Sequence, residues 1–357
     1  MSDKRPNIRS APYISVVACS RNDDHGGNLL HRMQLFVNGL INQCRRHQLR
    51  AELILVEWNP PANRSSLKDA LSWPSSDSFC DIRIIQVPAE IHGRFKHSDG
   101  LPVFQMIAKN VGIRRARSRF LLATNIDILF SDELMSFLAS GRLKEKRMYR
   151  IDRYDASSDI PADASIEEQL AFCRNNVIRV NGRNGTRNLH SGDYHEIYPV
   201  RARPSGLRAL ISRQRQIEYP EYTRLHTNAC GDFTLMSRES WLAVRGYPEF
   251  EMYSFHLDSL LCHAAYHSGT REEVLNDPMR IYHIEHGSGS GFTPEGEQHL
   301  DGRLKAAGVP KLTDDEFAVW AIRMRREGRP IIFNDEKWGL AGEGLPETVI
   351  GEDRQSA

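Results

Sequence analysis

The stretch of sequence that decides the fold is KNVGIRRARSRFLLATNIDILF, which runs from Lys109 to Phe130. Its first part continues a helical pattern that we expect over residues 104–116, and an apolar run over 119–123 predicts a buried strand. Asp127 stands directly past the end of that strand. In α/β sheets ligands bind beyond the carboxyl ends of the strands, so Asp127 is a candidate functional residue.

The same alternation occurs upstream. Near-continuous apolar runs at 13–19, 51–56 and 81–87 predict strands buried on both faces, and residues 29–46 carry apolar side chains at helical spacing. Short apolar strands that alternate with helices indicate an α/β protein with a Rossmann-like, doubly wound, mainly parallel sheet.

The second part of the chain is less regular. Residues 174–224 are polar with little periodicity, whereas an apolar pattern resumes at Phe233 and a capping box at Thr313 begins a final helix. We therefore divide the chain into four segments. These are a first half at 12–130, a helical and polar insertion at 131–227, a second half at 228–310, and a C-terminal helix and tail at 311–357.

Composition excludes several classes of protein. The chain has 357 residues, of which 40% are hydrophobic and 26% charged, as in an ordinary globular protein. A net charge of +1 argues against a nucleic-acid partner.

The sequence also bears on the location of the protein and on the state of its cysteines. No apolar run has the length of a transmembrane helix, and the charged start of the chain lacks a secretory signal. The cysteines form no Cys-x-x-Cys pair, so neither a zinc knuckle nor a disulfide framework is expected. We predict a cytoplasmic protein without a transmembrane anchor. The six cysteines are Cys19, Cys44, Cys80, Cys173, Cys230 and Cys262.

Asp127 offers a hard oxygen ligand at a strand end. Such a carboxylate suits Mg²⁺ or Mn²⁺, which bind through one or two carboxylates together with substrate phosphates. The alternative is a solvated aspartate that caps the following helix.

The helix and strand around Asp127 resemble glycosyltransferase family 2 and its GT-A-fold relatives. These enzymes share a helix of the pattern N-x-G-x-x-x-A, matched by Asn110, Gly112 and Ala116, and then a strand that ends in an Asp-x-Asp metal motif. Asp127 matches the last Asp of that motif, while Asn125 stands at the first.

The resemblance implies a function. Such a protein moves a sugar from a nucleotide diphosphate sugar to an acceptor hydroxyl, with Mn²⁺ or Mg²⁺ and by a single displacement with inversion. The acceptor would be a saccharide or a glycoconjugate, and the setting polysaccharide or glycoconjugate synthesis. Segment 12–130 would then bind the nucleotide sugar, and segment 228–310 would face the acceptor.

The nucleotide contacts follow from the same resemblance. Ser20, Arg21 and Asn22 lie in the loop that contacts the base in the family, and Glu57 matches an acidic residue that contacts the base or ribose. Asn110 and Asn125 complete the expected nucleotide-binding set. Alternatively, Arg21 and Glu57 pair with each other or with solvent.

The acceptor side begins at Gly231 and Asp232. Asp258 matches the Asp of the Glu-Asp pair at the start of a helix in the family, and Leu257 replaces the Glu. We expect Asp258 to take the proton from the acceptor hydroxyl as a general base. The alternatives are that Asp258 only complements the helix dipole, or that a neighbouring acid is the base. Those neighbours are Asp232, Glu249 and Glu251.

Two histidines follow the last expected strand. Many GT-A enzymes place a histidine there as a metal ligand or diphosphate contact, which makes His283 and His286 candidates. We favour His286, because it is nearer the flexible Gly-Ser-Gly run at 287–289.

A basic stretch lies at residues 201–215. It would meet an anionic acceptor or a membrane surface, although a solvated helix face is the commoner explanation. An acceptor on a lipid carrier would require peripheral attachment at the inner face of the membrane. The arginines concerned are Arg201, Arg203, Arg208, Arg213 and Arg215.

Two other functions are compatible with this sequence. A sugar nucleotidyltransferase also uses a doubly wound sheet and a divalent cation, but it normally has a glycine-rich loop with Arg or Lys after the first strand. The loop at 20–28 has Gly26 and Gly27 and no lysine. A catalytically degenerate nucleotide-sugar-binding protein would account for Asn125 and Leu257.

Overall fold

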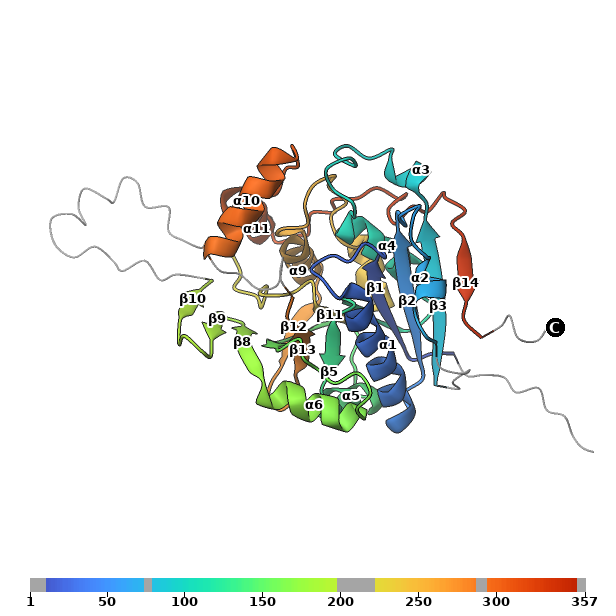
Figure 1. Ribbon diagram of the computed structural model, residues 1–357. Coiled ribbons are helices and arrows are strands. Elements are labelled where there is room, and N and C mark those ends of the chain that lie inside the picture. Colours follow the sequence, from blue (N-terminus) through green and yellow to red (C-terminus); the bar gives the residue numbers. More distant parts are fainter. Residues whose placement is uncertain (1–10, 74–78, 198–221, 287–293, 352–357) are drawn as a thin grey trace, which may run out of the picture.

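The structure is a computed structural model that describes residues 11–73, 79–197, 222–286 and 294–351. Within these residues, eight strands form a large sheet in the order β12-β6-β11-β4-β1-β2-β3-β14 (Figure 1). Their bounds are β1 Ile14–Ser20, β2 Ala51–Trp58, β3 Cys80–Val87, β4 Phe120–Thr124, β6 Arg147–Ile151, β11 Phe233–Ser237, β12 Arg271–Leu275 and β14 Glu347–Val349.

The centre of this sheet is parallel. Strand β1 pairs in parallel with β2 and with β4, and β2 pairs in parallel with β3. Strand β11 runs antiparallel between β4 and β6, and β14 runs antiparallel along β3. The predicted α/β class with a mainly parallel sheet is confirmed.

Helices cover both faces of the sheet (Figure 1). Alternate side chains of β1 divide between two cores: Val17 and Cys19 pack with α4, α8 and α9, whereas Val16 and Ala18 pack with α1 and α5. Burial on both faces explains the unbroken apolar run of β1. The helices are α1 Leu29–Arg46, α2 Leu67–Ala70, α3 Ala89–His92, α4 Gln105–Arg115, α5 Asp132–Ala139, α6 Ile166–Asn175, α8 Arg238–Val244, α9 Leu257–His267, α10 Pro294–Ala306 and α11 Asp314–Glu327.

A second sheet has the order β10-β9-β8-β7-β13-β5. Strand β13 pairs in parallel with β7 and antiparallel with β5. The chain passes from β6 of the large sheet to β7 of the second sheet through Asp152 alone. The bounds are β5 Ile128–Phe130, β7 Arg153–Ala156, β8 Val177–Gly182, β9 Gly185–Asn188, β10 Tyr194–Glu196 and β13 Ile281–Ile284.

The segment expected to be an insertion contributes to both sheets. Strand β6 lies inside the large sheet, and β8, β9 and β10 form antiparallel pairs within the stretch that shows little periodicity in sequence. The basic stretch at 201–215 and the Gly-Ser-Gly run at 287–289 lie outside the described residues. Among the described helices, none has the length and apolar character required to traverse a lipid bilayer.

Helix α4 lies unusually close to the sheet at Gly112. A Cβ atom on this residue would be 2.5 Å from Val17 Cγ1 and 3.2 Å from Val56 Cγ2. These neighbours belong to β1 and β2, so any side chain at position 112 would push the helix away from both strands. The glycine of the N-x-G pattern therefore has a packing role.

We predict that Gly112→Ala lowers the free energy of unfolding by about 1–3 kcal/mol, the usual cost of overpacking a core. Denaturant unfolding followed by circular dichroism measures this. Gly302→Ala in α10 is the matched control, because a Cβ there meets nothing within 4 Å. The control should be neutral or gain up to about 1 kcal/mol, and equal effects of the two variants would contradict the packing role.

Candidate active site

The end of β4 and the start of β5 bring Asp127 beside β13. Strand β5 begins one residue after Asp127 and runs antiparallel to β13, so that His283 pairs with Ile128. The backbone N–H of Ile284 also donates to the carbonyl oxygen of Asp127 at 2.9 Å. This pairing places both predicted histidines at the strand end that carries the predicted acid.

The three predicted metal ligands lie together. Asp127 Oδ2 is 3.3 Å from His286 Nε2 and 3.6 Å from His283 Nε2. Asp127 and His283 are buried, and Asp127 Oδ1 has no hydrogen-bond donor among the described residues. Both histidines, and not His286 alone, face the carboxylate.

The charges around Asp127 decide its ionisation. Burial raises the pKa of a carboxyl group, but His283, His286 and Arg32 together hold the pKa of Asp127 well below its usual range. Burial lowers the pKa of His283, yet Asp127 and Asp155 raise it above its ordinary value. Asp127 is therefore a carboxylate at neutral pH, which is the form that binds a cation.

Arg32 belongs to this site, although the sequence analysis missed it. Its Nη1 atom donates to Asp127 Oδ2 at 2.8 Å, and its Nε and Nη2 atoms donate to the carbonyl oxygen of Gly27 at 3.3 and 3.1 Å. It thereby ties the loop after β1 to the carboxylate. One feature of the sequence could have identified Arg32. It is an arginine that lies beside Leu29 and Met33, on the apolar face of a predicted helix.

The donor atoms around Asp127 fit a divalent transition-metal ion. Two imidazole nitrogens and a carboxylate whose Oδ1 atom is unpartnered form a mixed set, whereas Mg²⁺ prefers oxygen ligands. A second group of possible ligands joins His283 to Asp155 and Glu285. Asp127 contacts one guanidinium group, that of Arg32, through Oδ2 and keeps Oδ1 without a donor, whereas Asp155 has a guanidinium group beside each of its two oxygens. The group at Asp127 is therefore the better metal site.

A buried network of charges lies behind His283. Asp155 is fully buried and contacts Arg153 Nε at 2.8 Å and Arg179 Nε at 2.6 Å. Arg179 Nη2 also contacts Glu285 at 2.7 Å. The sequence analysis did not single out these residues, because each charge is explained only by partners on other strands.

Asn125 connects this network to Asp232, one of the residues that we expected on the acceptor side. Its Nδ2 atom makes a short hydrogen bond to Asp232 Oδ1, and its Oδ1 atom accepts from Gln105 Nε2 at 3.0 Å. Asp232 Oδ2 in turn accepts from Arg153 Nη1 at 2.6 Å. An aspartate at position 125 would place two carboxylates against each other, which gives a physical reason for the amide here.

Asp258 lies beside Gly231. A Cβ atom on Gly231 would be 3.0 Å from Asp258 Oδ2, so any other residue at position 231 would crowd this carboxylate. Asp258 Oδ1 accepts from the backbone N–H of Ser259 at 2.8 Å, while Oδ2 has no donor among the described residues. Fully buried Lys109 donates to the carbonyl oxygen of Gly231 at 2.7 Å and helps to hold the turn.

The other acidic side chains considered for this role also accept hydrogen bonds. Both oxygens of Asp232 accept hydrogen bonds, as described above. Glu249 Oε1 accepts from Asn110 and from the N–H of Gly339, and Glu251 Oε2 accepts from the N–H of Lys96. Asp232 thus has both oxygens engaged, whereas Asp258, Glu249 and Glu251 each have one oxygen that accepts no hydrogen bond among the described residues. The free oxygen of Asp258 is the Oδ2 atom that lies beside Gly231.

The expected nucleotide-binding residues of this region lie at the neighbouring carboxyl ends of β1 and β2. Ser20 pairs with Glu57 across the parallel strands. Asn22 Nδ2 donates to the carbonyl oxygen of Ser65 at 2.9 Å, and Arg21 Nη1 donates to that of Pro102 at 3.1 Å. These bonds draw three loops around the ends of β1 and β2.

Glu57 and Arg21 do not contact each other among the described interactions. Arg21 pairs with Asp23 at 3.3 Å. Glu57 is buried and accepts hydrogen bonds from the N–H of Leu67 at 2.7 Å and from Gln86 Nε2 at 3.2 Å. Burial raises the pKa of Glu57. Its carboxyl group thus organises the loop before α2, a role that the sequence analysis did not foresee.

Asn110, which we expected to contact the nucleotide, makes hydrogen bonds inside the protein. It is fully buried, its Nδ2 atom donates to the carbonyl oxygen of Tyr247 at 2.8 Å, and its Oδ1 atom accepts from the N–H of Tyr247 at the same distance. A Cβ atom on Gly246 would be only 2.2 Å from Asn110 Oδ1. Asn110 therefore clamps α4 to the turn after α8.

We predict that Asn110→Ala lowers the free energy of unfolding by about 1–3 kcal/mol, because the N–H of Tyr247 loses its acceptor. The affinity for a nucleotide sugar should not change. Denaturant unfolding and isothermal titration calorimetry measure the two quantities. A large loss of nucleotide affinity without a loss of stability would restore Asn110 to the nucleotide-binding set.

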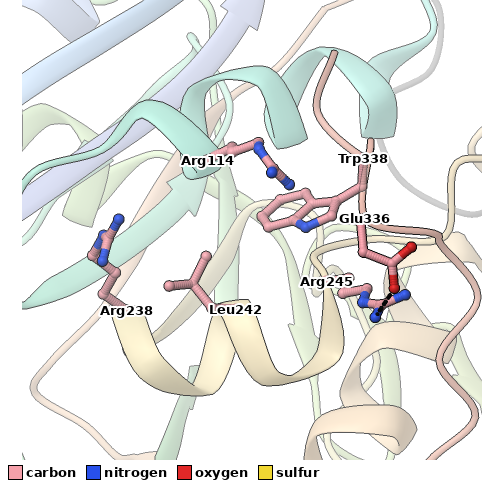
Figure 2. A pocket seen from close by; sticks show the side chains of 6 residues that line it. All are labelled: Arg114, Arg238, Leu242, Arg245, Glu336 and Trp338. Atoms are coloured by element: carbon pink, nitrogen blue, oxygen red, sulfur yellow. Dashed lines mark hydrogen bonds and ion pairs between the residues drawn. The ribbon is translucent and has the colours of Figure 1, made fainter. Parts of the chain in front are cut away.

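A cavity of about 310 Å³ lies elsewhere in the molecule (Figure 2). In it the guanidinium carbon of Arg114 lies 5.0 Å from the centre of the Trp338 ring. Helix α8 follows the end of β11 that pairs with Phe120, at the start of β4. The cavity thus lies at the opposite end of β4 from Asp127. Its lining residues are Arg114, Arg238, Leu242, Arg245, Glu336 and Trp338.

Comparisons with known proteins find likeness in structure alone. No protein-family model and no curated protein matches the chain. Among the solved structures that match it are two of GT-A-type glycosyltransferases. GalNAc-T7 with UDP, GalNAc and Mn²⁺ has 12% identity and a TM-score of 0.42, over 91% of this chain and 53% of that chain. S. aureus TarS 1-349 in complex with UDP has 12% identity and a TM-score of 0.40, over 87% of this chain and 69% of that chain.

The chain thus spans about half the length of the GalNAc-T7 chain.

Proposed function

We propose that the protein is a metal-dependent glycosyltransferase that moves a sugar from a nucleotide diphosphate sugar to an acceptor hydroxyl. The observation that carries the proposal is the buried Asp127 carboxylate, with one unpartnered oxygen and two imidazole groups facing it. These three side chains lie at a strand end, and α/β sheets bind substrates and cofactors beyond the carboxyl ends of their strands. The UDP in both matched structures and the Mn²⁺ in one agree with this proposal.

The donor would lie across the ends of β1, β2 and β4. Ser20, Arg21 and Asn22 form the loop at the end of β1, and Arg21 supplies a partly exposed guanidinium for an anionic donor. Asp127, His283 and His286 would hold the cation, which would neutralise the charge that develops on the departing diphosphate. The mixed nitrogen and oxygen ligands favour Mn²⁺ over Mg²⁺.

Asp258 would act on the acceptor. As the acceptor oxygen attacks the anomeric carbon, the bond from that carbon to the diphosphate oxygen breaks, and the hydroxyl proton passes to Asp258 Oδ2. A single displacement of this kind inverts the configuration of the anomeric carbon. Asp232 follows Gly231, which lies beside Asp258, and it bonds to Asn125, two residues before Asp127. This hydrogen bond supports a site in which the donor and the acceptor would meet at the end of β4.

We predict that Asp127→Asn abolishes the Mn²⁺-dependent part of nucleotide-sugar binding, because the amide lacks the charge that holds the cation. The affinity should fall more than the roughly 10–100-fold that loss of an outer metal-site partner produces. Calorimetric titration with UDP-, GDP- and dTDP-sugars, with and without Mn²⁺, measures the effect. Slow hydrolysis of the preferred donor should disappear as well.

Asp132→Asn is the control for this variant. Asp132 lies five residues further along the chain at the start of α5, where it pairs with Arg46 at 3.0 Å. It should bind donor and Mn²⁺ as the unsubstituted protein does. Donor binding that is the same with and without Mn²⁺ in the unsubstituted protein would refute metal dependence, and no binding of any nucleotide sugar would refute the transferase.

We predict that Asp258→Asn lowers the rate of transfer by about 10²–10⁴-fold, the usual contribution of a general base. Donor affinity should stay unchanged, because the base acts in the transition state. The amide oxygen can still accept from the N–H of Ser259, which protects the start of α9. Radiolabelled sugar transfer and donor titration measure the two effects.

Glu251→Gln is the matched control for the base. Glu251 is the runner-up acid, and its carboxylate accepts from the N–H of Lys96. The control should transfer sugar at close to the normal rate. A larger loss of transfer in Glu251→Gln than in Asp258→Asn would assign the base to Glu251.

A further inference from the structure

His283 lies between two buried carboxylates. Its Nε2 atom is 3.6 Å from Asp127 Oδ2, and its Nδ1 atom is 3.4 Å from Asp155 Oδ1. The parallel pairing of β13 with β7 sets His283 directly opposite Asp155. The two strands therefore turn one imidazole nitrogen toward the candidate metal ligands and the other toward Asp155.

Asp155 is held firmly by three cationic or amide donors. Its Oδ2 atom accepts from Arg179 Nε at 2.6 Å, from Asn181 Nδ2 at 3.0 Å and from Arg153 Nη2 at 3.3 Å. Its Oδ1 atom, which faces His283, is 2.8 Å from Arg153 Nε. A fully buried carboxylate with so many partners keeps one orientation.

The arginines that hold Asp155 are anchored in turn. Arg153 Nη1 contacts Asp232 at 2.6 Å, and Arg179 Nη2 contacts Glu285 at 2.7 Å. These two partners lie in different parts of the site, one on the acceptor side and one beside the histidines. The network thus joins the support of His283 to the rest of the candidate active site.

We propose that Asp155 is a positioning residue for the metal centre, which accepts the Nδ1 hydrogen of His283 and so directs the lone pair of Nε2 toward a cation on Asp127. A neutral imidazole carries its hydrogen on one nitrogen, and the other binds metal. Carboxylates that orient metal-binding histidines in this way typically change metal affinity by about 10–100-fold. The inference rests on the proposed metal-dependent function.

Asn at position 155 would reverse this arrangement. An asparagine has a single side-chain oxygen, and it would face the three donors that now bond to Asp155 Oδ2. These donors belong to arginine and asparagine side-chain N–H groups, which can only donate. The amide NH₂ group would then face His283 Nδ1 and donate to it. That nitrogen would have to supply its lone pair, which leaves the hydrogen on Nε2, where a metal ion would have to bind.

We predict that Asp155→Asn lowers the affinity for Mn²⁺ by about 10–100-fold, measured without donor by electron paramagnetic resonance of free Mn²⁺ in titrations of the full-length protein. Asp152→Asn is the matched control. Asp152 lies three residues earlier and also contacts a histidine, with its Oδ1 atom 2.8 Å from His226 Nε2. That variant should bind Mn²⁺ normally.

A double-mutant cycle separates positioning from a general structural role. In a His283→Gln background, the further change Asp155→Asn should have little effect on Mn²⁺ affinity, because its target is gone. Undiminished loss in that background would overturn the inference. If Asp155→Asn does not fold, the charge-balanced pair Asp155→Asn with Arg179→Gln is compared with Arg179→Gln alone, with the same expectation.

The outcomes distinguish this inference from the function on which it rests. Equal Mn²⁺ affinity of Asp155→Asn and the unsubstituted protein would overturn the positioning role alone. Failure of the unsubstituted protein to bind Mn²⁺ would overturn the metal-dependent function, and the positioning role with it.

Discussion

The rest of this structure depends on the burial of a carboxylate at the end of β4. Moving a charged group such as Asp127 out of water is costly unless cationic and hydrogen-bonding groups surround it. Arg32 from α1 and His283 and His286 at the end of β13 meet that requirement. An inward-facing arginine on α1, the pairing of β5 with β13 and the loop after β1 together bring the compensating groups to this one charge.

The compensation extends across two sheets. His283 contacts both Asp127 and Asp155, and Arg153 links Asp155 on the second sheet to Asp232 at the start of β11 on the large sheet. Each charged side chain of this network has an opposite charge beside it. The network is therefore stable as a unit and sensitive to the loss of any member. Such mutual dependence would suit the proposed site, in which fixed ligands would meet the diphosphate of the donor.

The elements that were foreseen are those whose burial leaves a pattern in the local sequence. The runs at 51–56 and 81–87 lie in β2 and β3, where burial on two faces gives unbroken apolar runs, and the helix expected over 29–46 is α1, where burial of one face gives apolar residues at helical spacing. Strands β7 and β12 were not foreseen, since Arg153 and Asp155 alternate in one and charged residues begin the other. Their polar residues have partners on distant strands, which no local pattern reveals.

The sequence by itself determined the α/β class, the positions of the central strands along the chain and the candidates Asp127, His283, His286 and Asp258, because these depend on periodicity and on motif spacing. Only the tertiary structure decided that both histidines face Asp127, that Asn110 and Glu57 are held by internal hydrogen bonds, and that Arg32 and Asp155 support the site. Those roles depend on which residues meet across strands and helices. Contacts between residues far apart in the chain form only when the sheets assemble.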